Sequence, residues 1–163
     1  MAVEIYIKID TIPGQSTTKG FEDQITVENF SWNMSQTTNF GSSTGGGAGR
    51  VNMGDLTFTH AVDKASPKLM IACCTGAHIA NATLTCRKAG GESPVDFLKI
   101  TLTDIIVSNV SPSGSNMGDT PTESIGLAFA EYKVEYQEQD NKGAKKGGPV
   151  IAGFSVQKNT KTA

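Results

Sequence analysis

Alternating apolar and polar residues dominate this chain and predict a protein built mainly from β-strands. In the first segment Val3, Ile5 and Ile7 fall on one face, while charged and aromatic residues fill the other. This period of two is typical of a half-buried strand. The same pattern predicts strands in residues 25–32, 50–59, 82–87, 95–110, 123–136 and 150–156. Changes of phase near Glu28 and at Gly54 predict β-bulges within two of these strands.

One stretch has helical signals instead. Ser66 is a suitable N-cap, Pro67 suits the first helical position, and Gly76 suits a left-handed C-cap. Helical spacing predicts an apolar face made of Leu69, Met70 and Cys73, with Ala77 beyond. We therefore expect one short helix over about residues 66–76, packed on the side or end of a β-structure.

Residues 33–49 contain few apolar side chains and end in a run of glycines. The absence of a periodic pattern predicts a long extended loop without secondary structure, a kind of segment that is usually functional or disordered. A phosphate-binding loop is not expected, because Gly47 and Ala48 stand where that motif needs lysine and a hydroxyl residue. A Gly-x-Gly-x-x-Gly motif fails as well, since Arg50 replaces its last glycine.

Composition agrees with a single small β-domain. The chain has 163 residues, 37% of them hydrophobic, with 18 glycines. This balance favours short strands and glycine turns, arranged as a small closed or two-sheet antiparallel β-barrel with one helix. The bulky apolar residues expected in its interior would fill a small barrel and leave no ligand cavity.

Charge and segment length exclude several classes of partner. The net charge is −2, so a nucleic-acid surface is not expected. The N-terminus lacks the continuous apolar run of a signal peptide. The longest apolar run, residues 69–74, is too short to cross a bilayer. We therefore expect synthesis in the cytoplasm and no membrane insertion.

The chain offers little that predicts catalysis. His60 and His78 lie in no known catalytic motif, and no carboxylates stand out as a buried pair. The three cysteines, Cys73, Cys74 and Cys86, are expected to be small buried hydrophobic residues, without a disulfide or zinc site. The lysines near residue 145 favour a solvated turn, with a basic contact to a partner as the alternative. No cofactor, metal ligand or catalytic residue is therefore predicted.

Several stretches, in the same order along the chain, resemble a known family. They are residues 1–10 (MAVEIYIKID), 30–36 (FSWNMSQ), 45–51 (GGGAGRV), 63–70 (DKASPKLM), 87–91 (RKAGG), 97–102 (FLKITL) and 131–136 (EYKVEY). Together they are similar to the haemolysin-coregulated protein (Hcp) family, the inner-tube subunits of bacterial type VI secretion systems. The resemblance spans the whole chain.

The resemblance implies a structural subunit and not an enzyme. Family members form homohexameric rings that stack into a tube, which a contracting sheath drives into a target cell behind a spike protein. They carry small effector proteins in the lumen and are secreted without a signal peptide. Residues 1–163 would form one tube domain, and because the last expected strand lies close to Ala163, no fused C-terminal effector domain is expected.

The resemblance also implies roles for particular residues. Ser31 and Asn29 would contact effectors in the lumen, which agrees with Ser31 pointing away from Phe30 and Trp32 in an alternating strand. The arm that contacts neighbouring subunits would contain Asn39, Phe40, Gly41, Gly45, Gly46, Gly47 and Arg50. Gly90 and Gly91 would lie near a rim of the ring.

Two alternatives remain at this point. A phage-type tail-tube subunit would have a closely similar structure in a different setting. A hydrolase or small-ligand β-barrel would show a deep pocket lined by His60 or His78 with an acidic partner.

Overall fold

The computed structural model describes residues 2–41, 45–88 and 93–163. These residues form eleven strands and one helix. In chain order the elements are β1 (Val3–Ile9), β2 (Ile25–Val27), β3 (Asn29–Ser31), β4 (Met34–Asn39), β5 (Gly47–Met53), β6 (Leu56–Ala61), α1 (Ser66–Thr75), β7 (Ile79–Lys88), β8 (Asp96–Ser113), β9 (Thr122–Tyr136), β10 (Val150–Ser155) and β11 (Thr160–Lys161). The expected helix and strands are therefore present, and the mainly β fold class is confirmed.

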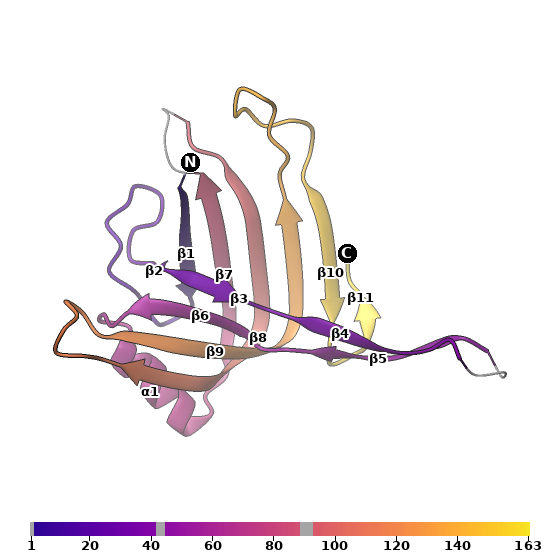
Figure 1. The fold of residues 1–163 in the computed structure, drawn as a ribbon, viewed down its shortest axis with the longest axis horizontal. Coiled ribbons are helices and arrows are strands. Elements are labelled where there is room, and N and C mark those ends of the chain that lie inside the picture. The colour runs from indigo at the N-terminus through magenta and orange to yellow at the C-terminus, as the bar shows by residue number, and fades with distance from the viewer. Residues whose placement is uncertain (1, 42–44, 89–92) are drawn as a thin grey trace.

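The long strands β8 and β9 connect two layers of antiparallel sheet. The first half of β9 pairs with β6 and its second half pairs with β10, while β8 pairs along both halves. Figure 1 shows β1, β7 and β10 in one layer, crossed by β6 and the start of β9 in the other. A register shift between Val107 and Asn109 marks the bend of β8. Gly126 lies opposite, where a Cβ atom would come within 3.2 Å of the Asn109 Cβ, so a glycine suits this bend.

The two layers meet at Glu28 through a change of strand partner. β2 pairs with β1, but β3 pairs with β6, and the Glu28 N–H donates to the Thr59 carbonyl at 2.8 Å. The bulge expected near Glu28 is thus a break between two short strands. The phase change at Gly54 is likewise a break, between β5 and β6. The two layers belong to one bent nine-stranded antiparallel sheet that does not close into a complete barrel, so the closed form of the prediction is not observed.

Apolar side chains from both layers fill the space between them. The fully buried residues include Ile7, Ile25, Leu56, Phe58, Leu84, Leu102, Ile105, Ile125 and Leu127. Phe30 and Trp32 are half-buried and pack against this core, as their alternation predicts. The interior is therefore packed with side chains along the described strands.

Helix α1 lies at one end of the layers and packs on β8. Leu69 and Ala72 are its buried apolar residues, while Met70 is exposed, so the predicted apolar face is partly wrong. Ala65 occupies the N-cap position instead of Ser66, which is the first helical residue and accepts from the Asp63 N–H through its Oγ. Gly76 has φ of 66° and ends the helix as predicted. Across the described ranges, no helix has the length and apolar character that a membrane span requires.

The cysteines differ in burial. Cys86 is buried and Cys73 half-buried, but Cys74 is exposed, so the expectation of burial is wrong for Cys74. Its position on the solvent face of α1 explains this difference. Burial raises the pKa of the Cys86 thiol to about 11, because the apolar surroundings disfavour the thiolate.

Candidate assembly surfaces

The segment expected to be a loop is a projecting β-hairpin. β4 and β5 pair with each other from Met34 and Met53 to Asn39 and Gly47. Figure 1 shows this hairpin, which we call the arm (residues 34–41 and 45–53), extending well away from the two layers. All residues of β4 are exposed. Alternation signals a strand only when one face is buried, so the sequence pattern could not show β4, while the end of β5 from Arg50 falls in the strand predicted over residues 50–59.

The root of the arm is fixed by contacts to the rest of the chain. Arg50 Nη2 donates to the Val156 carbonyl at 3.0 Å and to the Gln157 carbonyl at 3.4 Å. Just before the arm, Trp32 Nε1 donates to the Gly54 carbonyl at 3.0 Å. The Trp32 ring also lies edge-on to Tyr132, with 5.0 Å between the centroids. Because a lone two-stranded hairpin is marginal in water, these contacts stabilise and orient the arm.

The tip of the arm brings together most of the residues predicted to contact a neighbouring subunit. Phe40 is 84% exposed, and a Cβ added to Gly46 would lie 3.0 Å from the Phe40 ring. Asn39 and Gly47 form the last described pair of the ladder. Gly41 and Gly45 adjoin residues 42–44, which lie outside the described residues. Arg50 is at the root instead, bonded within its own chain, while Gly90 and Gly91 lie outside the described residues.

A second candidate surface is the outward face of the layer that contains β3. Ser31 and Asn29 are exposed, and Ser31 points away from the core as predicted. Strand register places small polar residues beside them, since directly paired residues share a face. One row contains Asn29, Thr59, Ser124 and Ser111, and the next contains Ser31, Thr57, Gly126 and Asn109. These two rows, which we call the polar face, carry no ionisable side chain.

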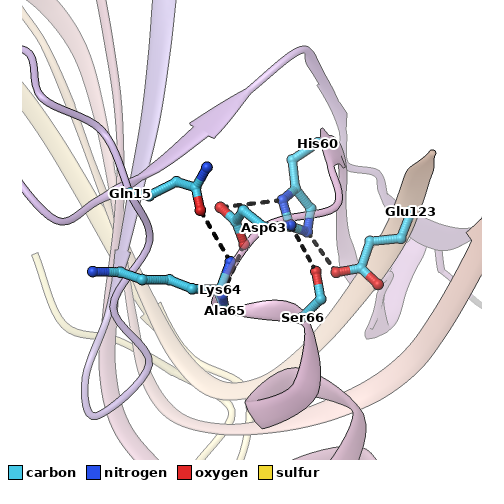
Figure 2. A network of polar contacts seen from close by, with 7 residues as sticks. All are labelled: Gln15, His60, Asp63, Lys64, Ala65, Ser66 and Glu123. Atoms are coloured by element: carbon cyan, nitrogen blue, oxygen red, sulfur yellow. Dashed lines mark hydrogen bonds and ion pairs between the residues drawn. The ribbon is translucent and has the colours of Figure 1, made fainter. Parts of the chain in front are cut away.

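The structure also contains a buried polar pair that the sequence did not reveal. His60 of β6 and Glu123 of β9 are cross-strand partners, with 2.8 Å between His60 Nε2 and Glu123 Oε1. Figure 2 shows Asp63 on the other side of the imidazole, with its Oδ2 3.8 Å from His60 Nδ1. His60 and Glu123 are both essentially inaccessible to solvent. No sequence signal could have found this pair, because it depends on the register of β6 against β9.

Neither histidine has the setting that a hydrolase would need. His60 is sealed from solvent, so no substrate can reach it in this conformation. His78 forms a 2.8 Å contact with Asp104, but both side chains are more than half exposed, which makes the pair a surface contact. The structure therefore gives the hydrolase alternative no support from these residues.

The basic segment near residue 145 is an exposed turn. Lys146 Nζ pairs with Glu138 at 3.1 Å, and both side chains are mostly exposed. This agrees with the expectation of a solvated turn, and an ion pair of this kind contributes little to stability.

The fold and its exposed features define a two-layer antiparallel β-protein with one helix and a projecting arm. Residues 6–136 match the family model described as "Type VI secretion system effector, Hcp". Protein hcp1 of Pseudomonas aeruginosa is 47% identical over 159 residues, which is 98% of each chain. The chain therefore belongs to the Hcp family of type VI secretion system proteins. This match favours the type VI assignment over the phage-type alternative.

Solved structures agree with the family assignment. The crystal structure of Hcp1 from Salmonella typhimurium is 37% identical and superimposes with a TM-score of 0.82, covering 99% of this chain and 100% of that one. A structure described as that of a type six secretion system protein is 32% identical, with a TM-score of 0.92 and the same coverage. The chain thus shares its mainly β fold with these two structures along nearly its whole length.

Proposed function

We propose that this protein is a structural subunit of the type VI secretion inner tube, in which residues 1–163 form one tube domain. The observation that carries the proposal is the arm, which extends from the body and carries the exposed ring of Phe40 just after β4. A large apolar side chain on a solvent-exposed hairpin gains free energy only by docking on another surface. A neighbouring copy of the chain is the partner that the family assignment supports.

An arm that docks on a different patch of the next copy makes a heterologous contact. Such contacts generate a closed ring when the rotation between copies closes. The family resemblance supports a hexameric ring, with rings stacked axially into a tube. Exposed strand edges favour the same behaviour, since β11 pairs only with Phe154 and Ser155, and Val150 at the other end of β10 is largely exposed.

The polar face around Ser31 and Asn29 suits the wall of the lumen. Its small side chains without charge allow proteins of different surface charge to pass or to be held weakly. In this proposal the tube carries small effectors, is tipped by a spike protein and is surrounded by sheath subunits. The subunit assembles in the cytoplasm and leaves the cell when the sheath contracts. It acts by assembly and not as an enzyme.

Light scattering and negative-stain electron microscopy of the purified chain test the proposal. The expected result is a hexamer in solution and an annulus in images, because closure of the heterologous contact sets a discrete size. A clean monomer at micromolar concentration would overturn the proposal.

A further inference from the structure

A basic groove lies on the outward face of the layer formed by β1, β7 and β8. The hollow has a volume of about 460 Å³, and its floor includes Thr83 and Thr85 of β7. The described residues that line it include four cations and one acid, namely Lys8, Lys19, Arg87, Lys99 and Asp96. The chain as a whole has a net charge of −2, so this concentration of positive charge is local and would attract an anionic partner.

Arg87 is held in place at one end of the groove. Its guanidinium lies over the Phe21 ring, 4.9 Å from the centroid, and Phe21 stacks on Tyr6 at 4.4 Å. The Glu4 carboxylate is 3.8 Å from Arg87 Nε, which is too long for a hydrogen bond. Within the described residues, the buried Nε has no hydrogen-bond partner. A guanidinium that is already oriented loses little entropy when it binds a carboxylate.

The spacing of the cations favours an extended segment over a single small anion. Lys8 pairs with Thr83, and Thr85 pairs with Lys99, so the two lysines lie on strands separated by β7. Two strand spacings amount to about 10 Å, so the positive charges are spread along the groove and not gathered at one point. An extended peptide presents alternate side chains about every 7 Å, so a run of acidic residues can place carboxylates at several points along such a groove.

We propose that the groove binds an extended acidic segment of a partner protein, with carboxylates placed on Arg87, Lys8 and Lys99. The exposed lysines supply charge attraction, and the oriented Arg87 supplies the geometric anchor. The Thr83 hydroxyl at the floor provides a further polar group for the peptide backbone. The inference rests on the described groove and holds whether or not the subunit forms rings.

Binding of a fluorescein-labelled peptide of alternating glutamate and serine to the full chain tests the proposal. Fluorescence anisotropy at low ionic strength is expected to show saturable binding that weakens as salt is added. Lys8→Gln and Lys99→Gln should each weaken binding about two- to fivefold, and Asp96→Asn should strengthen it. The matched controls are Lys68→Gln and Lys158→Gln, which make the same charge change at exposed positions outside the groove and should leave binding unchanged.

Two outcomes would overturn the proposal. Equal weakening by the groove and control variants would show that the peptide responds only to net charge. Displacement of the peptide by an equal concentration of inorganic phosphate would show that the groove takes a lone anion. Light scattering on the same samples separates this proposal from tube assembly, because the oligomeric state and peptide binding are independent readouts.

Discussion

His60 of β6 and Glu123 of β9 form a buried hydrogen-bonded pair, with 2.8 Å between His60 Nε2 and Glu123 Oε1. His60 also approaches Asp63, whose carboxylate caps the chain just before α1 by accepting from the Ala65 N–H at 2.8 Å. The pair therefore links the second layer of the sheet to the start of the helix. Because it is inaccessible, we assign it a role in the stability of the fold.

Removing one partner of this pair should destabilise the protein strongly. Glu123→Ala is expected to lower the free energy of unfolding by about 3 kcal/mol or more, because the imidazole is left buried without its partner. The double variant His60→Phe, Glu123→Leu should recover much of this loss, since an apolar pair needs no hydrogen bond. Urea denaturation at one protein concentration measures both effects. Equal stability of the single and double variants would contradict a specific pairing.

The exposed ring at the tip of the arm should matter for assembly and not for folding. Phe40→Asp is expected to weaken subunit association about tenfold or more, because an aromatic anchor in an interface contributes about 1–2 kcal/mol. Sedimentation over a range of protein concentrations measures this change. Met117→Asp is the matched control, since Met117 is 94% exposed on a different loop. The arm hypothesis fails if the two variants assemble alike.

Arg50 should control the orientation of the arm. Arg50→Gln removes the guanidinium that donates to the Val156 and Gln157 carbonyls, while Lys158→Gln removes a nearby charge without touching these bonds. Since a hydrogen bond contributes about 0.5–1.5 kcal/mol, amide exchange in β5 should accelerate roughly tenfold in the Arg50 variant alone. Hydrogen exchange followed by mass spectrometry measures this. Unchanged exchange would show that other contacts hold the root.

The cysteines should differ sharply in reactivity. Cys74 is exposed, whereas burial raises the pKa of the Cys86 thiol from 9.0 to about 11. Alkylation at neutral pH should therefore modify Cys74 first and Cys86 only after unfolding, as peptide mapping would show. Early modification of Cys86 in the folded protein would contradict its burial.

The raised pKa of the Cys86 thiol predicts that stability depends on pH. The folded state binds the Cys86 proton more tightly than the unfolded state, so this contribution to stability is fully present below pH 9.0 and is lost as pH rises toward 11. Cys86→Ala should lower stability overall but remove that part of the alkaline loss. Thermal unfolding of the unsubstituted protein and of Cys86→Ala at several pH values between 9.0 and 11 measures whether stability falls with rising pH as expected.

Predictions from the sequence succeeded where burial leaves a periodic pattern. β1 and β9 each have a buried face, and their alternation is visible without any structure. β4 and the start of β5 were missed because their residues are exposed on both faces. The expected burial of Met70 was wrong, since helical spacing does not say which side of the helix meets β8. That of Cys74 was wrong because the apolar character of a thiol does not say on which side of the helix it lies. The family resemblance was confirmed, while the roles of Ser31, Asn29 and the arm residues stay predictions.

Local chemistry and collinear sequence similarity were enough to determine the mainly β class, the short helix that ends at Gly76 and the Hcp family. They carry this information because propensity, alternation and capping act over a few neighbouring residues. Tertiary structure alone decided the partners of distant segments. Strand register placed His60 against Glu123 and Arg87 against Glu4, and contacts with residues 156–157 oriented the arm through Arg50. Such relationships depend on how the whole chain packs, which no short stretch of sequence specifies.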